Sequence, residues 1–178
     1  MTIKLAIFDR DNTINFMPPE RRYLYGNGLI CLLATTAEAI QTLNQRGIIV
    51  VVASNQRGIA LDEYPQMTSD SVNLYNQRLN ACLMERGAHI DKFYICPHRA
   101  SDNCTCRKPK PGLILQALEE YEIAPSDAVI IGNSQTDIDA GLAAGIRAIA
   151  VPYPPDTTVR PEVTSFPTLL QAVKAALE

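Results

Sequence analysis

The sequence predicts a doubly wound α/β fold, in which helices cover both faces of a parallel sheet. Five short apolar runs alternate with helical patterns along the chain, and helical crossovers join parallel strands. The 178 residues are 47% apolar and 20% charged, which is enough for one buried core. We therefore expect a single domain that spans residues 1–178.

The five strands are expected where short apolar runs are bounded by polar residues. They cover residues 3–8, 48–53, 93–96, 129–131 and 148–151. Continuous apolar runs of this length are typical of strands that are buried on both faces. Ligands of such sheets collect at the carboxyl ends of the strands, so the residues that follow each strand are the candidates for a site.

Helices are expected after each of these strands. Their ranges are residues 35–47, 68–87, 111–121, 137–144 and 168–177. Thr35 and Glu38 have the spacing of a capping box, and Gly47 suits the end of the first helix. Apolar residues recur at intervals of three and four from Val72 to Leu83, which predicts one buried helix face. The predicted order is a strand and a helix, five times over.

The charge balance argues against a broad interaction surface. The chain has 16 Lys and Arg against 19 Asp and Glu, a formal net charge of −3, which disfavours an extended nucleic-acid or membrane-surface footprint. No apolar run approaches the length of a membrane span, and no secretory apolar segment follows Met1. We therefore expect a cytoplasmic monomer without a membrane or nucleic-acid partner.

Two carboxylates, Asp9 and Asp11, follow the first strand. Extended geometry points residues i and i+2 to the same side, and two like charges so placed favour a cation between them. Carboxylate oxygens are ligands that suit Mg²⁺. A solvated acidic turn is the alternative interpretation.

Features that suit phosphate follow two more strands. Ser54 and Asn55 open a polar loop after the second strand, where free backbone N–H groups can meet an anion. Lys108 precedes a helix, and the N-terminal end of a helix favours phosphate. Residues 96–112 contain four basic residues and one acidic residue, a local charge of +3.

A glycine turn at residues 132–137 follows the fourth strand, and Asp137 there can cap or polarise the next helix. Each of these segments has a harmless explanation when it is considered alone. Their occurrence at successive strand ends of one parallel sheet nevertheless predicts a functional site.

A cluster of potential metal ligands lies just before Lys108. It consists of Cys96, His98, Cys104 and Cys106. Three thiolates and one imidazole can surround a tetrahedral Zn²⁺ without an open position, which indicates a structural site that stiffens this loop. Reduced thiols beside a surface histidine are the alternative. Cys31 and Cys82 lie in apolar patterns, and we expect them to be small core residues.

From about Ile3 to Val151 the chain resembles the haloacid dehalogenase superfamily of phosphohydrolases. The four motifs of that family match Asp9-x-Asp11-x-Thr13, Ser54, Lys108 and residues 132–137. The similarity is closer to its zinc-containing branch of heptose bisphosphate phosphatases and histidinol-phosphatases. It rests there on Asp-Arg-Asp-x-Thr-Ile-Asn, Ser-Asn-Gln-x-Gly-Ile-Ala and Cys-Pro-His…Cys-x-Cys-Arg-Lys-Pro-x-Pro-Gly.

The resemblance implies a role for each matching residue. Asp9 would be the nucleophile that forms an aspartyl-phosphate, and Asp11 would protonate the leaving oxygen and later activate water. Ser54 and Lys108 would hold phosphoryl oxygens. The other implied roles are substrate contacts for Thr13, Asn55 and Arg107, Mg²⁺ ligation by Asp9, Asp11 and Asn133, and support by Asp137.

This chain departs from the family pattern at three places. Asn133 stands where the family has Asp, which removes one negative charge and predicts weaker Mg²⁺ binding. Asn12 replaces a glycine, but asparagine tolerates a left-handed backbone. Residues 16–23 differ from the family's Asp-x-Gly-Tyr-Val stretch, which puts the choice of substrate in doubt. The spacing also leaves no room for a large cap domain.

The resemblance implies a Mg²⁺-dependent phosphomonoester hydrolase for a small phosphorylated metabolite, with a sugar phosphate such as D-glycero-D-manno-heptose 1,7-bisphosphate as the expected substrate. A histidinol-phosphatase shares all of the motifs. A polynucleotide 3'-phosphatase is disfavoured because the chain is acidic and lacks an extended basic stripe. A non-catalytic phospho-ligand-binding protein is disfavoured because the catalytic motif residues are present.

Overall fold

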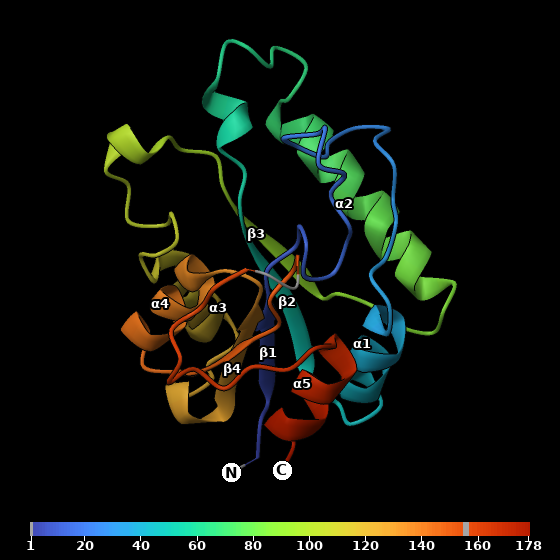
Figure 1. Ribbon diagram of the computed structural model, residues 1–178, viewed down its shortest axis with the longest axis vertical. Coiled ribbons are helices and arrows are strands. Elements are labelled where there is room, and N and C mark those ends of the chain that lie inside the picture. The colour runs from blue at the N-terminus through green and yellow to red at the C-terminus, as the bar shows by residue number, and fades with distance from the viewer. Residues whose placement is uncertain (1, 155–156) are drawn as a thin grey trace.

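A five-stranded parallel sheet forms the centre of the computed structural model, which describes residues 2–154 and 157–178 (Figure 1). The strands are β1 (Leu5–Phe8), β2 (Ile49–Asn55), β3 (Lys92–Cys96), β4 (Ala128–Gly132) and β5 (Arg147–Ala150). Their order across the sheet is β3-β2-β1-β4-β5, and Leu5 of β1 pairs with Ile49 on one side and Ala128 on the other. The predicted parallel α/β sheet is confirmed.

Helices cover both faces of this sheet. They are α1 (Thr36–Asn44), α2 (Ser69–Met84), α3 (Gly112–Glu120), α4 (Gln135–Ala143) and α5 (Leu169–Ala176). Figure 1 shows α3 and α4 on one side of the sheet and α1 and α5 on the other. Successive strand residues face opposite sides, so Ala6 and Phe8 pack in the core beneath α1, α2 and α5, whereas Leu5 and Ile7 pack against α3 and α4.

The strand order reverses at β1, whose two neighbours are β2 and β4. At such a point the connections leave the sheet in opposite directions and open a crevice at the carboxyl ends of the strands. Asp9, Ser54 and Asn133 lie at the ends of β1, β2 and β4 respectively, so the topology brings them to one edge.

The start of α1 differs from the sequence prediction. Thr35 has a left-handed backbone with φ of 67°, and its side chain makes no capping hydrogen bond, so the expected capping box is wrong. The Thr35 hydroxyl oxygen instead accepts a hydrogen bond from the backbone N–H of Leu170 in α5, at 3.3 Å. A tertiary contact between α1 and α5 has replaced the local cap. Gly47, by contrast, has the positive φ of 69° that a helix end favours.

The expectation that Cys31 and Cys82 are core residues is wrong. Cys31 is exposed and Cys82 is half-buried. Cys31 lies on the irregular segment between β1 and α1, where its neighbours Ile30 and Leu32 supply the apolar contacts to the core. An apolar pattern on such a segment does not determine which of its members points inward.

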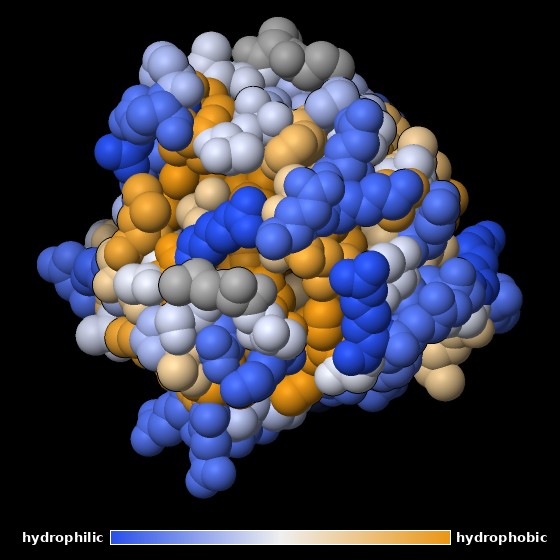
Figure 2. Space-filling view, turned by 90° about the horizontal axis from the view of Figure 1, so that it is seen from below, coloured by the Kyte–Doolittle hydropathy of each residue, from blue (hydrophilic) through white to orange (hydrophobic). Residues whose placement is uncertain are grey.

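Both termini lie at the end of the molecule opposite the crevice (Figure 1). Figure 2 views that end, where hydrophilic side chains project around the rim and hydrophobic residues are visible between them. Within residues 2–154 and 157–178, no helix has the length and apolar character needed to cross a membrane.

Candidate active site

A cavity of about 190 Å³ lies at the carboxyl edge of the sheet. It brings together six of the residues predicted from the sequence, namely Asp9, Asp11, Ser54, Asn55, Lys108 and Asp137. Its other lining residues are Met17, Arg22, Tyr23, Ser134 and Thr136. Elements far apart in sequence therefore meet around one small space.

Lys108 is the buried cation of this cavity. Its Nζ lies 2.7 Å from Asp9 Oδ1 and 2.6 Å from Asp137 Oδ1, and it also donates to the backbone oxygen of Ala53 at 2.5 Å. Burial acts to lower the pKa of Lys108, but the carboxylates of Asp137 and Asp9 outweigh burial and raise that pKa above its ordinary value. The amine therefore stays charged between two carboxylates.

The carboxyl group of Asp9 has a pKa well above its ordinary value. Burial raises its pKa to about 7, with further upward contributions from Asp137 and Asp11 and an opposing contribution from Lys108. Lys108 holds Oδ1, while Oδ2 accepts no hydrogen bond from any described residue. Asp9 thus offers one oxygen that is free for a metal ion or for attack on an electrophile.

Arg10 fixes the second carboxylate, Asp11. Its side chain is fully buried, and it donates from Nε to Asp11 Oδ1 at 3.0 Å and from Nη2 to Asp11 Oδ2 at 2.9 Å. The same guanidinium donates to the backbone oxygen of Leu24 and to Asn76 Oδ1, and it lies 4.9 Å from the ring centre of Tyr75. The two-point contact restricts rotation of the Asp11 carboxylate.

Gln56 connects Asp11 to Ser54. Its Nε2 donates to Asp11 Oδ2 and to Ser54 Oγ, both at 2.9 Å. Gln56 and Ser54 are both buried, whereas Asp11 is partly exposed toward the cavity. The serine hydroxyl keeps its own hydrogen as a donor for an anion, because it acts as the acceptor in its contact with Gln56.

Asn55 positions the backbone of Lys108. Its Oδ1 accepts from the Lys108 N–H at 3.1 Å, and its Nδ2 donates to the Lys108 carbonyl oxygen at 3.0 Å. Both ends of the Asn55 amide are therefore engaged within the protein. The end of β2 is in this way fastened to the loop that carries the buried lysine.

The turn after β4 holds Asp137 in place. Asp137 Oδ2 accepts from the backbone N–H of Ser134 at 3.0 Å and from its hydroxyl at 2.7 Å, which leaves Oδ1 for Lys108. Gly132 packs directly against the Asp137 side chain, and a Cβ at Gly132 would overlap it. Asp137 both caps α4 and orients Lys108.

Thr13 and Asn133 lie next to each other but do not line this cavity. Asn133 Nδ2 donates to the backbone oxygen of Tyr153 at 2.9 Å, and Asn133 Oδ1 lies 3.5 Å from the Thr13 hydroxyl. Thr13 is buried. Asn12 has the expected left-handed backbone, with φ of 60°.

The four predicted zinc ligands converge at the end of β3 and in the loop that follows it. They are Cys96, His98, Cys104 and Cys106, whose ligand atoms all lie within 4.8 Å of one another. Neighbouring Sγ atoms are 3.2–3.7 Å apart, and His98 Nδ1 is 3.3 Å from Cys106 Sγ. A tetrahedral Zn²⁺ with Zn–S bonds of about 2.3 Å requires spacings of roughly 3.8 Å, so small adjustments complete the geometry.

Arg107 follows the last of these ligands and lies outside the cavity that contains Asp9. Its Nη1 donates to the backbone oxygen of His98 at 3.3 Å. It lines a neighbouring cavity of about 160 Å³, which Lys108 also lines. The loop from Cys96 to Lys108 is therefore held at both ends.

Comparison with known proteins identifies the family of this chain. The HAD-hydrolase-like family model matches residues 105–154, which include Lys108 and the turn after β4. D-glycero-beta-D-manno-heptose-1,7-bisphosphate 7-phosphatase from Pseudomonas putida KT2440 is 34% identical over 149 residues, covering 84% of this chain and 82% of the relative. The chain belongs to the haloacid dehalogenase superfamily.

Other members of the superfamily extend the match. The phosphatase of the same name from Pseudomonas aeruginosa PAO1 is 30% identical and covers 96% of this chain and 99% of the relative. The crystal structure of D,D-heptose 1,7-bisphosphate phosphatase from B. bronchiseptica, complexed with magnesium and phosphate, has a TM-score of 0.86 and 25% identity over 98% of each chain. The predicted identity as a phosphatase of this superfamily, a phosphomonoester hydrolase, is confirmed.

Sequence reasoning missed Arg10, Gln56, Arg22 and Tyr23. Arg10 and Gln56 hold Asp11, whereas Arg22 and Tyr23 line the cavity. The sequence offered one usable signal, because Arg10 stands between two acidic residues on a chain leaving a buried strand. Arg22 and Tyr23 lie on residues 16–23, the segment whose departure from the superfamily pattern bears on substrate choice, but the sequence pattern assigns neither residue a role.

Proposed function

We propose that this member of the superfamily is a Mg²⁺-dependent phosphomonoester hydrolase that acts through an aspartyl-phosphate on a small phosphorylated metabolite. The observation that carries the proposal is the arrangement around Asp9. One of its oxygens is held by the buried Lys108 and the other is free, and Ser54 and the Lys108 amine lie in the same cavity. A carboxylate placed beside phosphate-binding groups is suited to nucleophilic attack on phosphorus.

The donor set around Asp9 suits Mg²⁺, a hard cation that prefers oxygen ligands. Asp9 supplies a free carboxylate oxygen, and burial together with Asp137 and Asp11 raises its pKa to about 7, which a nearby cation would offset. The backbone carbonyl oxygen of Asp11 and the side chain of Asn133 would supply the other protein ligands. When bound, Mg²⁺ neutralises charge on the transferring phosphoryl group.

The residues of the cavity divide the chemistry between them. Asp9 attacks phosphorus, so its oxygen gains a P–O bond as the bond to the leaving oxygen breaks. Asp11 in its protonated form gives a proton to the leaving oxygen, and Asp11 in its ionised form, the form that Arg10 binds, takes a proton from the water that hydrolyses the aspartyl-phosphate. The Ser54 hydroxyl and the Lys108 ammonium group donate to phosphoryl oxygens, where charge is spread in the transition state.

The proposed substrate is a sugar phosphate such as D-glycero-D-manno-heptose 1,7-bisphosphate. The support is that two relatives covering most of this chain carry the name of a 7-phosphatase for that compound. The chain also spans 82% and 99% of the length of those relatives.

A phosphate-release assay tests the proposed function. Purified protein is incubated with heptose 1,7-bisphosphate, other sugar phosphates and histidinol phosphate, with and without Mg²⁺, and the variant Asp9→Asn is the control. We expect Mg²⁺-dependent release that Asp9→Asn reduces by at least 10³-fold. Release from every substrate at the level of Asp9→Asn would refute the hydrolase proposal.

The proposal includes a structural Zn²⁺ bound by Cys96, His98, Cys104 and Cys106. Four protein ligands leave no position for substrate, so the ion would hold the loop in shape. This loop ends at Lys108, whose backbone Asn55 also fixes. The chemistry at Asp9 therefore depends on the fold of residues 96–108, the cysteine loop.

A further inference from the structure

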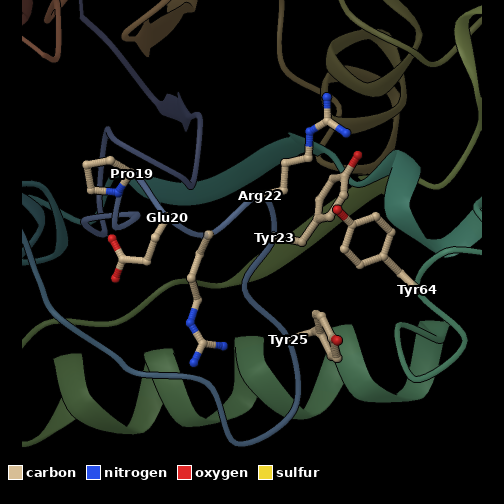
Figure 3. A pocket seen from close by; sticks show the side chains of 7 residues that line it. Pro19, Glu20, Arg22, Tyr23, Tyr25 and Tyr64 are labelled. Atoms are coloured by element: carbon tan, nitrogen blue, oxygen red, sulfur yellow. The ribbon is translucent and has the colours of Figure 1, made fainter.

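A second cavity adjoins the one that contains Asp9. Its volume is about 420 Å³, within the range of pockets that bind small molecules. Figure 3 shows its lining residues, which are Pro19, Glu20, Arg21, Arg22, Tyr23, Tyr25 and Tyr64. Arg22 and Tyr23 line both cavities. A substrate whose phosphate lies at Asp9 can therefore extend past these two side chains into the second space.

The Tyr23 side chain, which lines both cavities, is held by contacts on several sides. Tyr23 Oη accepts a hydrogen bond from Arg57 Nε at 2.9 Å, and its ring meets Tyr64 edge to face, with ring centres 4.9 Å apart. Gly58 packs beneath the ring, where an added Cβ would lie 3.0 Å from Tyr23 carbons. These contacts join the segment after β1 to the loop after β2.

Arg22 is a cation that lines both cavities. Arg21 and Arg22 are both exposed, and no described carboxylate lies within ion-pair distance of either guanidinium group. Of these two arginines, only Arg22 borders the cavity that contains Asp9. In Figure 3 its side chain extends away from Glu20 and Tyr25. A guanidinium group with unused donors binds a phosphate through two parallel hydrogen bonds.

We propose that the second cavity binds the leaving group of the substrate and that Arg22 binds a second phosphate on that group. The inference rests on the proposed function and assigns a specificity-determining residue for its bisphosphate substrate. Tyr23, Tyr25 and Tyr64 offer ring faces and hydroxyl groups, which suit the hydroxylated carbon chain between two phosphates. Arg22 is thereby a residue that determines specificity on the segment where this chain departs from its superfamily.

The test compares two substrates that differ only in the second phosphate, heptose 1,7-bisphosphate and heptose 7-phosphate. The variant Arg22→Gln removes the charge and keeps much of the side-chain length. We expect kcat/KM for the bisphosphate to fall at least tenfold further than kcat/KM for the monophosphate. The matched control is Arg46→Gln, an exposed arginine that lines neither cavity. An equal loss on both substrates, or no loss on either, overturns the assignment of Arg22.

A binding measurement separates this inference from the proposed function. Asp9→Asn is titrated calorimetrically with heptose 1,7-bisphosphate in the presence of Mg²⁺, alone and combined with Arg22→Gln or Arg46→Gln. We expect the Kd to rise at least tenfold with Arg22→Gln only. If this holds and wild type releases no phosphate, the hydrolase proposal fails and the subsite stands. Absence of binding to Asp9→Asn, or equal Kd values with and without Arg22→Gln, overturns the subsite.

Discussion

The guanidinium group of Arg10 holds both oxygens of the Asp11 carboxylate, at 3.0 and 2.9 Å, and at the same time binds the backbone oxygen of Leu24. Leu24 follows Tyr23 in the chain, so one buried cation fixes the proposed acid–base residue and the segment that separates the two cavities. The shape of the substrate pocket and the orientation of Asp11 are therefore mechanically connected.

Replacing Arg10 is expected to destabilise the fold and impair the reaction. The substitution Arg10→Gln leaves the Asp11 carboxylate without its buried partner and removes donors from Leu24 and Asn76. Breaking a buried pair by removing one partner typically costs about 3–5 kcal/mol. Urea denaturation measures this loss, and steady-state kinetics measures kcat and KM separately.

The two readouts for Arg10→Gln distinguish a positioning role from a purely structural one. If Arg10 orients Asp11, kcat falls in the part of the protein that remains folded, and Arg10→Lys recovers stability better than kcat because an ammonium group cannot bind both oxygens in parallel. Arg46→Gln, at an exposed position, is expected to change stability by less than about 0.5 kcal/mol. Unchanged kcat in folded Arg10→Gln contradicts the positioning role.

The raised pKa of Asp9 makes the stability of the Mg²⁺-free protein depend on pH. The folded carboxyl group binds its proton more tightly than the unfolded one, because its pKa is about 7 instead of 3.8. This contribution to stability is complete below pH 3.8 and is lost as pH rises through about 7. Ionised Asp9 therefore opposes folding at pH 8 when no cation is bound.

Asp9→Asn removes that titration. With zinc retained and Mg²⁺ omitted, we expect Asp9→Asn to gain about 1–3 kcal/mol of stability over wild type between pH 5 and pH 8. Mg²⁺ is expected to stabilise wild type more than Asp9→Asn, which reduces the difference. Denaturation curves at several pH values measure both effects. A difference between the two proteins that does not vary with pH contradicts the assignment of the raised pKa to Asp9.

The sequence predicts the elements and the strand-end residues of the site because both depend on local patterns. Asp9, Ser54 and Lys108 converge as expected, since the parallel topology places the ends of β1 and β2 at one edge. Arg10 could not be recognised as buried, because its partners Leu24 and Asn76 are 14 and 66 residues away. The capping box predicted at Thr35 was wrong for the same reason, because the hydrogen-bond partner of Thr35, Leu170, lies far away in the sequence in α5.

The cysteine loop is expected to lose its metal and its shape when one ligand is removed. In the metal-free protein, burial and the neighbouring thiols of Cys96 and Cys104 raise the pKa of Cys106 to about 12. Zn²⁺ must therefore displace protons to bind, and its affinity is expected to fall as pH decreases. For Cys106→Ser we expect zinc content to fall from about one per chain toward zero, with lower thermal stability and lower kcat.

The control for the zinc prediction is Cys31→Ser, because Cys31 is an exposed thiol outside the cluster. We expect this variant to keep its zinc, its melting temperature and its activity. Metal analysis, thermal denaturation and phosphate release are measured on the same preparations. A zinc-free Cys106→Ser protein with full activity and stability would show that the metal does not hold Lys108 in place.

Asn133 differs from the superfamily's Asp, and the structure shows what the amide does. Its Nδ2 donates to the backbone oxygen of Tyr153 at 2.9 Å, a contact that an aspartate cannot make. Asn133→Asp therefore loses the hydrogen bond to Tyr153 and places a negatively charged carboxylate at the proposed metal site. The variant is expected to lose about 1 kcal/mol of stability without Mg²⁺.

With Mg²⁺ the direction of the effect is expected to reverse. A carboxylate binds Mg²⁺ more strongly than an amide oxygen, so the Mg²⁺ concentration for half-maximal activity of Asn133→Asp should fall about tenfold, equivalent to about 1.4 kcal/mol. Asn27→Asp adds the same charge at an exposed turn and should leave this concentration unchanged. An unchanged Mg²⁺ requirement in Asn133→Asp means that Asn133 is not a ligand, and its contact with Tyr153 is then its principal role.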